Sequence, residues 1–595
     1  MPAPNHAFAL MQKAVDFHRQ GNMPEAEQSY RAVLAADPRH VDALRLLGGL
    51  YMQSNEPGRA ADCFEQALAL APDHPELLNN LGVALYGQGR REEALARYRQ
   101  AVRLAPEFGD AIDNLGTTLL ACGKPDEAIA WLQRSLQLRP GNAQTYIRLG
   151  HACRTQGQKA EAIEHYRRAL NLAPENAEAL THLGNLLREA GQSEEACAAY
   201  RRLVALQPQN ANIRLNLGTI FHDMGKTAEA MEHYDEVLRL EPHATGAIVS
   251  RAGLLMESDR PEEAHKGYEQ ALRLNPGLAD AEWGKALALL ALGDYAEGWK
   301  LYEARFARRP IRDPVLLATP RWRGEDLRGK RLLIWGEQGL GDMLQFVRYA
   351  GLCINRGAAV IVQCQPALRR LLRNCPFIDE IVATPAEGRC DYQIPAMSLP
   401  LAFGTTLETI PKDTPYLFVD QDTRRKWTPR FAGAEGFKVG LVWAGNPRKN
   451  QIEAHITDRQ RSMALEAMKP LLDVPGCRFY NLQKGAAADE IAVDGLGARL
   501  IDYMPEAGDF LDTAAIIEHL DLVISVDTSV VHVAGGLGKP VWVLSRFGGC
   551  WRWLRNREAS PWYPAVRVFG QTALGDWEHC IEKVCLTLRE RLLVS

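Results

Sequence analysis

The sequence lacks the features that mark several classes of protein. Its 12 cysteines are scattered, with no Cys-x-x-Cys pair and no metal-site spacing, so neither a disulfide framework nor a zinc module is predicted. The 69 lysines and arginines do not outnumber the 73 aspartates and glutamates, which leaves no basic footprint for nucleic acid. No apolar run reaches membrane-spanning length, and the first residues lack a basic start followed by an apolar core. We expect a soluble cytoplasmic protein with reduced thiols.

Prolines recur every 34 residues over more than half of the chain. They stand at Pro38, Pro72, Pro106, Pro140, Pro174, Pro208, Pro242, Pro276 and Pro310. A period of this length is typical of stacked helical hairpins. Each proline lacks a backbone donor and is therefore placed to end the second helix of its unit. The repeat predicts an α-solenoid of nine units over residues 7–312.

Small and large residues alternate in register within this period. Counted from Val41, the eighth position is glycine in six consecutive units and then alanine, and the twentieth position is alanine. The twenty-fourth position is aromatic except at Leu132. A small eighth residue predicts that two helices cross closely there. The pattern resembles the tetratricopeptide repeat (TPR), whose arrays bind peptides and proteins.

One polar column of the repeat is a candidate binding surface. The sixth position, which faces the concave groove in arrays of this family, holds Asn80, Asn114 and Asn216, with other residues between them. An asparagine side chain offers a donor and an acceptor, so it matches a peptide group of any sequence. In TPR-containing glycosyltransferases, similar asparagines grip an extended protein substrate. The alternative is that these side chains only solvate the groove.

After Pro310 the pattern of apolar and polar residues changes. Short apolar runs alternate with helical patterns, which predicts parallel sheets covered on both faces. A polar stretch at 420–436 divides the region. We expect a linker at 313–330, Rossmann-like halves at 331–420 and 437–575, and a C-terminal helix at 577–595. Helices are also predicted at 344–357 and 509–520, and strands at 331–336, 358–364, 378–384, 392–396, 437–444, 478–483, 498–503, 520–527, 540–545 and 566–570.

The first candidate site follows the predicted strand at 331–336. In GEQGLGDMLQF, Gly339 and Gly341 let the chain turn tightly, and Asp342 stands at the start of a helix. The third glycine of a dinucleotide fingerprint is missing, so this loop is not a dinucleotide site.

The second candidate site follows the strand at 520–527. That strand runs into Asp527, Thr528 and Ser529, and His532 lies one turn into the next helix. Free backbone amides at a helix start, with two hydroxyl groups beside them, suit a phosphate group.

These segments resemble the heptosyltransferase-like glycosyltransferase family 9, and more closely its bacterial members fused to TPR arrays. The matching segments are WGEQGLGDMLQFVRYA, VGLVWAGNP, RSM at 461–463, FYNLQKG, DFLDTAAIIEHLDLVISVDTSVVHVAGGLGKPVW and SPWYP, within residues 319–575. The resemblance implies a GT-B fold, in which two Rossmann domains face a cleft. It also implies an inverting glycosyltransferase that needs no metal and no cofactor beside its nucleotide-sugar substrate.

The resemblance also implies roles for these residues. Asp342 would deprotonate the acceptor hydroxyl, as a positioned carboxylate can. Thr528, Ser529 and His532 would contact the donor phosphates, and Asp527 would shape their turn.

Cationic side chains would stabilise the leaving diphosphate, and Lys484 and Arg461 are the candidates. Each of these residues also has a purely structural alternative. Asp342 and Asp527 are then helix caps, and His532 is a helix residue with its hydrogen bonds made within the protein. Lys484 and Arg461 are then solvated surface residues. The tryptophans at 551, 553 and 562 are expected to pack, with stacking on the donor as the alternative.

The chain departs from the family between WAGNP and RSM. It inserts RKNQIEAHITDRQ where donor contacts are expected, so His455 and Lys449 are alternatives to Arg461.

The sequence as a whole predicts a cytoplasmic protein glycosyltransferase. The array would bind a protein substrate, with flagellin as the leading candidate, and the C-terminal region would move a sugar from a nucleotide donor to Ser or Thr hydroxyls. One alternative is a transferase that builds cell-surface polysaccharide or lipopolysaccharide. The other is a TPR scaffold without catalysis.

Overall fold

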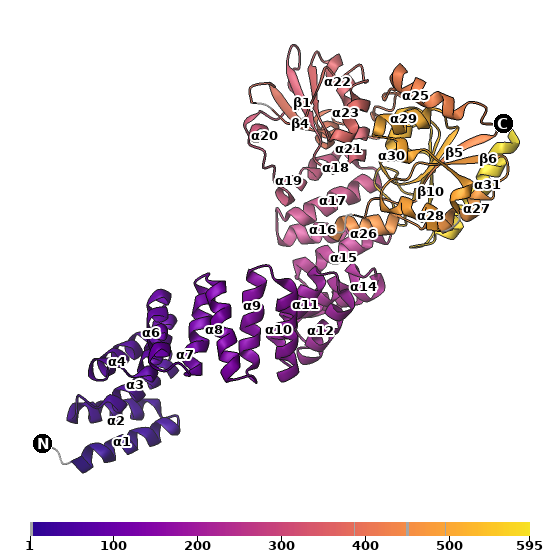
Figure 1. Cartoon of the computed structure of the whole chain (residues 1–595). Helices are drawn as coiled ribbons and strands as arrows, with labels where there is room; N and C mark the ends of the chain where they lie inside the picture. The colour runs from indigo at the N-terminus through magenta and orange to yellow at the C-terminus, as the bar shows by residue number, and fades with distance from the viewer. Residues whose placement is uncertain (1–3, 386, 448–451, 494–495, 595) are drawn as a thin grey trace. The chain divides into compact units, whose positions relative to one another are not determined.

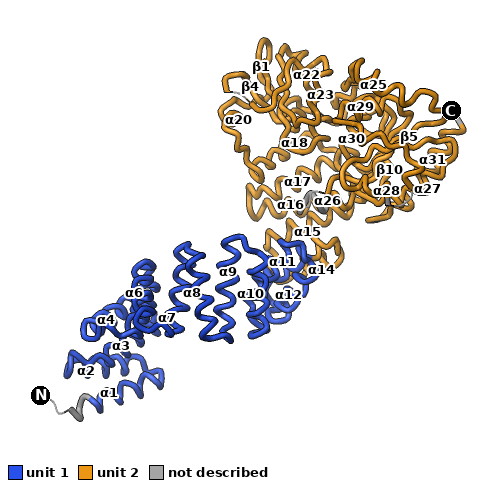
Figure 2. The backbone as a smooth tube through the Cα atoms, in the orientation of Figure 1, with its two compact units in different colours: residues 1–220 blue, residues 221–595 orange. Residues whose placement is uncertain are grey.

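The computed structural model describes residues 4–385, 387–447, 452–493 and 496–594. The chain divides into two compact units, residues 1–220 (unit 1) and residues 221–595 (unit 2), shown in Figure 2. The division falls inside the repeat array, within helix α13 (Ala211–Asp223). No helix of the described residues is long and apolar enough to cross a membrane.

Unit 1 consists of helices that follow one another in pairs, one pair in each 34-residue repeat (Figure 1). The expected α-solenoid is therefore confirmed. Its helices before α13 are α1 (Pro4–Arg19), α2 (Met23–Ala36), α3 (Val41–Gln53), α4 (Pro57–Leu70), α5 (Pro75–Gly87), α6 (Arg91–Leu104), α7 (Gly109–Ala121), α8 (Pro125–Leu138), α9 (Ala143–Thr155), α10 (Lys159–Leu172), α11 (Ala177–Glu189) and α12 (Ser193–Leu206).

The repeated prolines end helices as predicted. Helix α4 ends at Leu70, and Pro72 follows two residues later, a spacing that recurs along unit 1. The turn inside each repeat uses a second column that the sequence analysis did not consider. Its residues have positive φ, which glycine, asparagine and aspartate tolerate best. They include Asn55, Gly89, Gly123, Gly157, Gly191, Gly225, Asp259 and Gly293.

The glycine at the eighth position of the repeat is required by a close helix crossing. A Cβ atom on Gly48 would lie 2.5 Å from Cε1 of Phe64, and one on Gly82 would lie 2.5 Å from Cε1 of Tyr98. Both rings are buried and belong to the second helix of the same repeat. The predicted match of small and large residues is confirmed at these crossings.

Neighbouring glycines in α3 allow a matched test of this crossing. We expect Gly48→Ala to destabilise unit 1 by about 1–3 kcal/mol, because the new methyl group overlaps the Phe64 ring. Nothing lies within 4 Å of a Cβ on Gly49, so Gly49→Ala should stabilise the helix by about 0.5–1 kcal/mol. Urea unfolding followed by circular dichroism measures both changes. Equal midpoints for the two variants would contradict the crossing.

Unit 2 begins with the remaining helices of the array and two short helices that follow them. These are α14 (Thr227–Leu240), α15 (Thr245–Glu257), α16 (Pro261–Leu274), α17 (Ala279–Leu292), α18 (Tyr295–Tyr302), α19 (Arg305–Arg308) and α20 (Pro314–Ala318). Helix α20 lies within the stretch that was expected to be a linker.

The first sheet of unit 2 has four parallel strands in the order β3-β2-β1-β4. In β1 only the first residue is exposed, as expected for a strand covered on both faces. The strands are β1 (Arg331–Trp335), β2 (Ala359–Gln363), β3 (Glu380–Val382) and β4 (Tyr392–Pro395). Helices of this part are α21 (Leu340–Phe346), α22 (Tyr349–Asn355), α23 (Pro366–Leu372), η1 (Ala396–Ser398) and α24 (Leu399–Ala402).

The second sheet has six parallel strands in the order β10-β9-β8-β5-β6-β7. This is the doubly wound order, which reverses between β5 and β8. The strands are β5 (Phe437–Val442), β6 (Cys477–Asn481), β7 (Leu500–Asp502), β8 (Leu522–Val526), β9 (Val541–Ser545) and β10 (Val566–Gly570). The helices are α25 (Gln421–Phe431), α26 (Ile452–Arg461), η2 (Leu465–Met468), α27 (Lys469–Leu472), η3 (Ala486–Asp489), α28 (Glu490–Val493), η4 (Leu496–Arg499), η5 (Met504–Glu506), α29 (Phe510–Glu518), α30 (Ser529–Gly536) and α31 (Trp577–Val594).

The predicted parallel α/β region is confirmed, and every predicted strand agrees with an observed one to within two residues at each end. The helix predicted at 344–357 differs. It begins at Leu340 and is interrupted before Tyr349, which gives α21 and α22. The polar stretch at 420–436 is largely helical, because Asp420 accepts a hydrogen bond from the Thr423 amide and caps α25.

Candidate functional site

The two predicted strand-end loops meet in unit 2. Helix α21 follows β1 of the first sheet, helix α30 follows β8 of the second, and the two helices pack together. A Cβ atom on Gly341 would lie 2.9 Å from Cδ2 of His532. Neither Gly339 nor Gly341 has a positive φ. Neither glycine is therefore required for a left-handed backbone conformation, and Gly341 permits the approach of His532.

Asp342 is both a helix cap and a member of this site. Its Oδ2 accepts a hydrogen bond of 2.8 Å from the amide of Gly339 at the start of α21. Its Oδ1 lies 2.5 Å from Nη2 of Arg552, in an ion pair whose two side chains are mostly buried. One carboxylate oxygen thus fixes the local backbone while the other faces the loop after β9.

Arg552 was not identified from the sequence. Its Nε donates to Oε1 of Gln345 at 2.7 Å, and its guanidinium lies 4.3 Å from the ring centroid of Trp551. Burial lowers the pKa of this guanidinium, but Cys550 and Asp342 raise it by more, so the group stays charged. The only signal in the sequence is an arginine between two tryptophans in the WRW segment.

A chain of hydrogen bonds determines the tautomer of His532. Its Nδ1 lies 2.8 Å from the hydroxyl of Tyr563, which lies 3.2 Å from the hydroxyl of Tyr416. Tyr416 donates to the carbonyl of Leu344 at 2.9 Å. All three bonds form only if Tyr563 donates to Tyr416 and Nδ1 of His532 carries the hydrogen. The Nε2 atom then carries a lone pair.

The buried imidazole of His532 is neutral. Burial holds its pKa well below the usual range, and the charges of Arg552, Arg348 and Arg461 lower the pKa further. Neutral Nε2 with a lone pair accepts a hydrogen bond and does not donate one. This property fits a hydroxyl group better than the ionised phosphate that the resemblance assigns to His532.

Removing the Tyr563 hydroxyl should remove the preference of His532 for the Nδ1-protonated tautomer. We expect histidine ¹⁵N NMR spectra of the native protein to show a protonated Nδ1 at His532, and Tyr563→Phe to shift the ring toward the Nε2-protonated form. His532→Gln assigns the resonance. Tyr349→Phe is the matched control, because its buried hydroxyl bonds Thr405, 2.9 Å away, outside this chain of bonds. An unchanged His532 spectrum in Tyr563→Phe would contradict the network.

The first amides of α30 donate no capping hydrogen bond to the side chain of the N-cap residue. Thr528 is the N-cap residue, but its side chain makes no capping bond, and its Oγ1 lies 3.1 Å from Oγ of Ser525. Asp527, Thr528 and Ser529 are all partly exposed. This arrangement suits an anionic group.

The side chain of Arg461 bonds to the backbone of this turn. Its Nη1 donates to the carbonyl of Asp527 at 2.8 Å, and its Nη2 pairs with Asp458. Its Nε is buried and has no hydrogen-bond partner among the described residues. A Cβ on Gly445 would lie 2.7 Å from this Nε, so a glycine is needed beside it. The geometry brings Arg461 to the predicted donor site.

Lys484 lies apart from these contacts. Its Nζ donates to the carbonyl of Ala507, and the residue is exposed. Of the two alternatives to Arg461, His455 belongs to helix α26, and Lys449 lies outside the described residues.

The inserted segment contacts the last repeats of the array. In α26, Nη2 of Arg459 lies 3.3 Å from the carbonyl of Asp223, and Nε2 of Gln460 donates to Glu257 at 3.0 Å. Arg546, after β9, donates to Gln460. Burial raises the pKa of Glu257, but His222 and Gln460 lower it by more, so the carboxylate is charged. The insertion therefore joins two parts of unit 2.

A buried ion pair holds the first loop from the array side. Arg305 in α19 donates to Glu337 through Nε at 2.9 Å and Nη2 at 2.8 Å. The side chains are only 6% and 10% exposed. Burial raises the pKa of Glu337 despite this pairing.

Breaking this pair should cost stability. We expect Arg305→Ala to lower the unfolding free energy of unit 2 by about 3–5 kcal/mol, because Glu337 stays buried without its partner. The control Arg389→Ala removes an exposed pair with Glu380 and should cost no more than about 1 kcal/mol. Denaturant unfolding followed by tryptophan fluorescence gives both values. Equal losses of unfolding free energy would show that the buried pair contributes no more to stability than the exposed pair.

The tryptophans near this site pack against protein. Nε1 of Trp562 lies 3.2 Å from the hydroxyl of Tyr295, and the rings of Trp551 and Trp299 are 5.2 Å apart. Trp553 stacks on His532 at 5.9 Å. All of these tryptophans are buried, as expected for packing residues.

The asparagine column in unit 1 has a neighbour, Asn79, that was not identified from the sequence. Asn79 is buried, donates to Oδ1 of Asn80 at 3.4 Å and accepts from Nδ2 of Asn114 at 3.0 Å. These bonds link two successive repeats. Asn216 is exposed. Binding of a substrate backbone by Asn80, Asn114 and Asn216 stays a prediction.

One acidic pair of the sequence bears on the expectation of a site without metal. Asp420 and Asp422 have Asp-x-Asp spacing, a pattern used by metal-dependent transferases. Asp420 caps α25, and Asp422 pairs with Arg425 at 2.9 Å. Both carboxylates therefore have local structural roles.

Sequence profiles described as tetratricopeptide repeats match residues 11–75, 50–107, 110–175, 165–198, 184–225 and 221–290. The chain contains tetratricopeptide repeats. Arrays of this family mediate interactions between proteins, and the solenoid supports such a role here.

One curated relative shares sequence with about half of the chain. Protein FlbA of Caulobacter vibrioides is 30% identical over 349 residues, which cover 52% of this chain and 55% of FlbA. The chain thus spans about half the length of that relative.

Solved structures similar to parts of the chain include MamA and PilF. MamA is 26% identical with a TM-score of 0.27, over 28% of this chain and 96% of MamA. PilF of Pseudomonas aeruginosa is 26% identical with a TM-score of 0.32, over 36% of this chain and 94% of that structure.

Proposed function

We propose that the protein is an inverting glycosyltransferase of the GT-B type that modifies a protein bound by its TPR array. The observation that carries the proposal is the packing of α21 on α30, helices that follow strands of two parallel sheets and carry Asp342 and His532. The start of α30 and three guanidinium groups lie beside them. Ligands of doubly wound sheets bind outside the carboxyl ends of the strands, where the strand order reverses.

The donor phosphates would bind at the start of α30. The amides of the partly exposed residues there, the hydroxyls of Thr528 and Ser529, and Arg461 would balance the charge that grows on the leaving phosphate. Asp527 would shape this turn, since its carbonyl accepts a hydrogen bond from Arg461. No step in this scheme needs a cofactor beside the nucleotide-sugar.

The acceptor hydroxyl needs a group that takes its proton as the oxygen attacks the sugar carbon. Asp342 is the proposed base, with Arg552 holding Oδ1 in place. The ion pair fixes the direction of the carboxylate, and positioning contributes much of the rate in such a step. Nε2 of His532 is placed to accept a second hydroxyl hydrogen and so to orient a substrate.

The base assignment is tested by Asp342→Asn. The amide keeps the shape of the side chain but takes no proton, so transfer should fall by about 10²–10⁴-fold while donor affinity stays near that of the native protein. Transfer is measured by intact-mass spectrometry of the acceptor, and donor affinity by calorimetry.

Asp420→Asn is the matched control for this test. It changes another carboxylate that caps a helix in unit 2, and transfer should stay near the native rate. If Asp342 acts only as a cap, both variants would transfer sugar at similar rates.

The acceptor class is a further part of the proposal. We propose Ser or Thr hydroxyls of a protein substrate in the cytoplasm, with flagellin as the leading candidate. Intact masses of flagellin and of pulled-down partners, with and without this protein, identify both acceptor and sugar. Sugar found on glycan or lipid but never on protein would favour a polysaccharide or lipopolysaccharide transferase. A scaffold without catalysis would tolerate Asp342→Asn and His532→Ala without any effect.

A further inference from the structure

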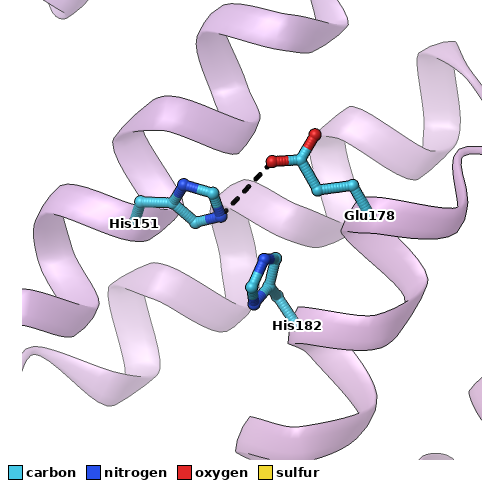
Figure 3. Close-up of side chains that lie close together, drawn as sticks. All are labelled: His151, Glu178 and His182. Carbon is cyan, nitrogen blue, oxygen red and sulfur yellow. Dashed lines mark ion pairs between the residues drawn. The ribbon is translucent and has the colours of Figure 1, made fainter. Parts of the chain in front are cut away.

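Three side chains able to bind a metal meet in unit 1, outside the site described above. His151 belongs to α9, and Glu178 and His182 belong to α11 of the next repeat (Figure 3). One ligand atom from each side chain lies within 4.8 Å of the other two. Nε2 of His151 is 3.7 Å from Oε1 of Glu178, and the two imidazole centroids are 4.4 Å apart.

The backbone places these side chains together for simple reasons. Glu178 and His182 are four residues apart on one helix, so they share one face of α11. His151 reaches the same place from the neighbouring repeat. His182 also occupies the sixth repeat position, in the column that contains the groove asparagines.

Two nitrogen atoms of this cluster lack hydrogen-bond partners, although one of them, Nε2 of His151, lies 3.7 Å from Glu178. Nε2 of His151 and Nδ1 of His182 are buried and have no hydrogen bond among the described residues. Burying a polar atom without a partner costs free energy, and such an atom calls for an explanation. A bound metal ion supplies a partner for one nitrogen of each ring.

The two imidazoles lie among charges of both signs. Burial, with a smaller effect of His182, lowers the pKa of His151 to about 4. Burial also lowers the pKa of His182. Glu178 opposes these shifts, and its carboxylate would balance part of the charge of a cation. Arg154 lowers both pKa values, so its charge would weaken the site without blocking it.

We propose that His151, Glu178 and His182 bind a Zn²⁺ ion in the TPR array. Two imidazoles and one carboxylate are a ligand set that Zn²⁺ accepts in protein sites. Zinc–nitrogen bonds of about 2.0–2.1 Å require the ligand atoms to approach one another to about 3.3 Å. The side chains of His151 and Glu178 are 29% and 45% exposed, so they have room for this movement.

Such an ion would have two effects on the array. It would join consecutive repeats through α9 and α11, and it would thereby stabilise unit 1. Three protein ligands also leave one tetrahedral position open, for water or for a side chain of a bound protein.

Metal binding by the full chain tests the proposal. The metal-free protein is titrated with Zn²⁺ against a chromophoric chelator, and with Co²⁺ to record the visible spectrum of the bound ion. We expect one tight Zn²⁺ site, a tetrahedral Co²⁺ spectrum, and loss of both in His151→Ala and His182→Ala. Zinc should also raise the melting temperature of the native protein, because it binds the folded state.

Two further variants separate loss of the zinc ligands from a general loss of folding. His165→Ala is the matched control, because burial also lowers the pKa of this histidine and its Nδ1 also lacks a partner, but it lies outside the cluster. It should retain the tight site. Glu178→Gln preserves the shape of the cluster and should weaken Zn²⁺ binding even if the alanine variants fold poorly. Equal Zn²⁺ affinity in the native protein, His182→Ala and Glu178→Gln would overturn the proposal.

Discussion

The approach of α21 to α30 is the contact on which the candidate site depends. Each helix begins at the strand end of a different parallel sheet, and each sheet changes its strand order at that strand. Gly341 has no side chain, and this lets the ring of His532 lie against the backbone of α21. The contact therefore brings Gly341, the residue before Asp342, close to Ser529 at the start of α30. A larger residue at 341 would separate the two halves of the site.

Charge inside this contact is balanced by groups from several segments. Arg552 pairs with Asp342, while two tyrosines hold His532 in one tautomer. Removing one partner from such a network leaves a buried polar group unsatisfied, which costs more than the bond itself contributes. Asp342 has a structural role in this balance, and the proposed role as a base would add to it. A cap and a base are compatible roles, since they use different oxygen atoms.

The last repeats of the array form part of the unit that carries this site. Arg305 holds the loop after β1 through Glu337, Trp299 packs on the loop after β9, and Glu257 receives the inserted helix α26. The compact unit consequently begins within the array and includes these repeats. Protein binding and sugar transfer, if both are present, would share this structural support.

The sequence by itself determined the periodic parts of this protein. The period of 34, the small residue at each crossing and the apolar runs predict the solenoid and the strands, because these depend on neighbours along the chain. Asp342, Asp527 and His532 were found in the same way, at strand ends. Local patterns did not reveal Arg552, Glu337 or the His151 cluster, since the partners of these residues lie on other elements. Which atom of His532 faces the site, and which charges surround it, is decided only by tertiary packing, because burial and distance between remote segments set both.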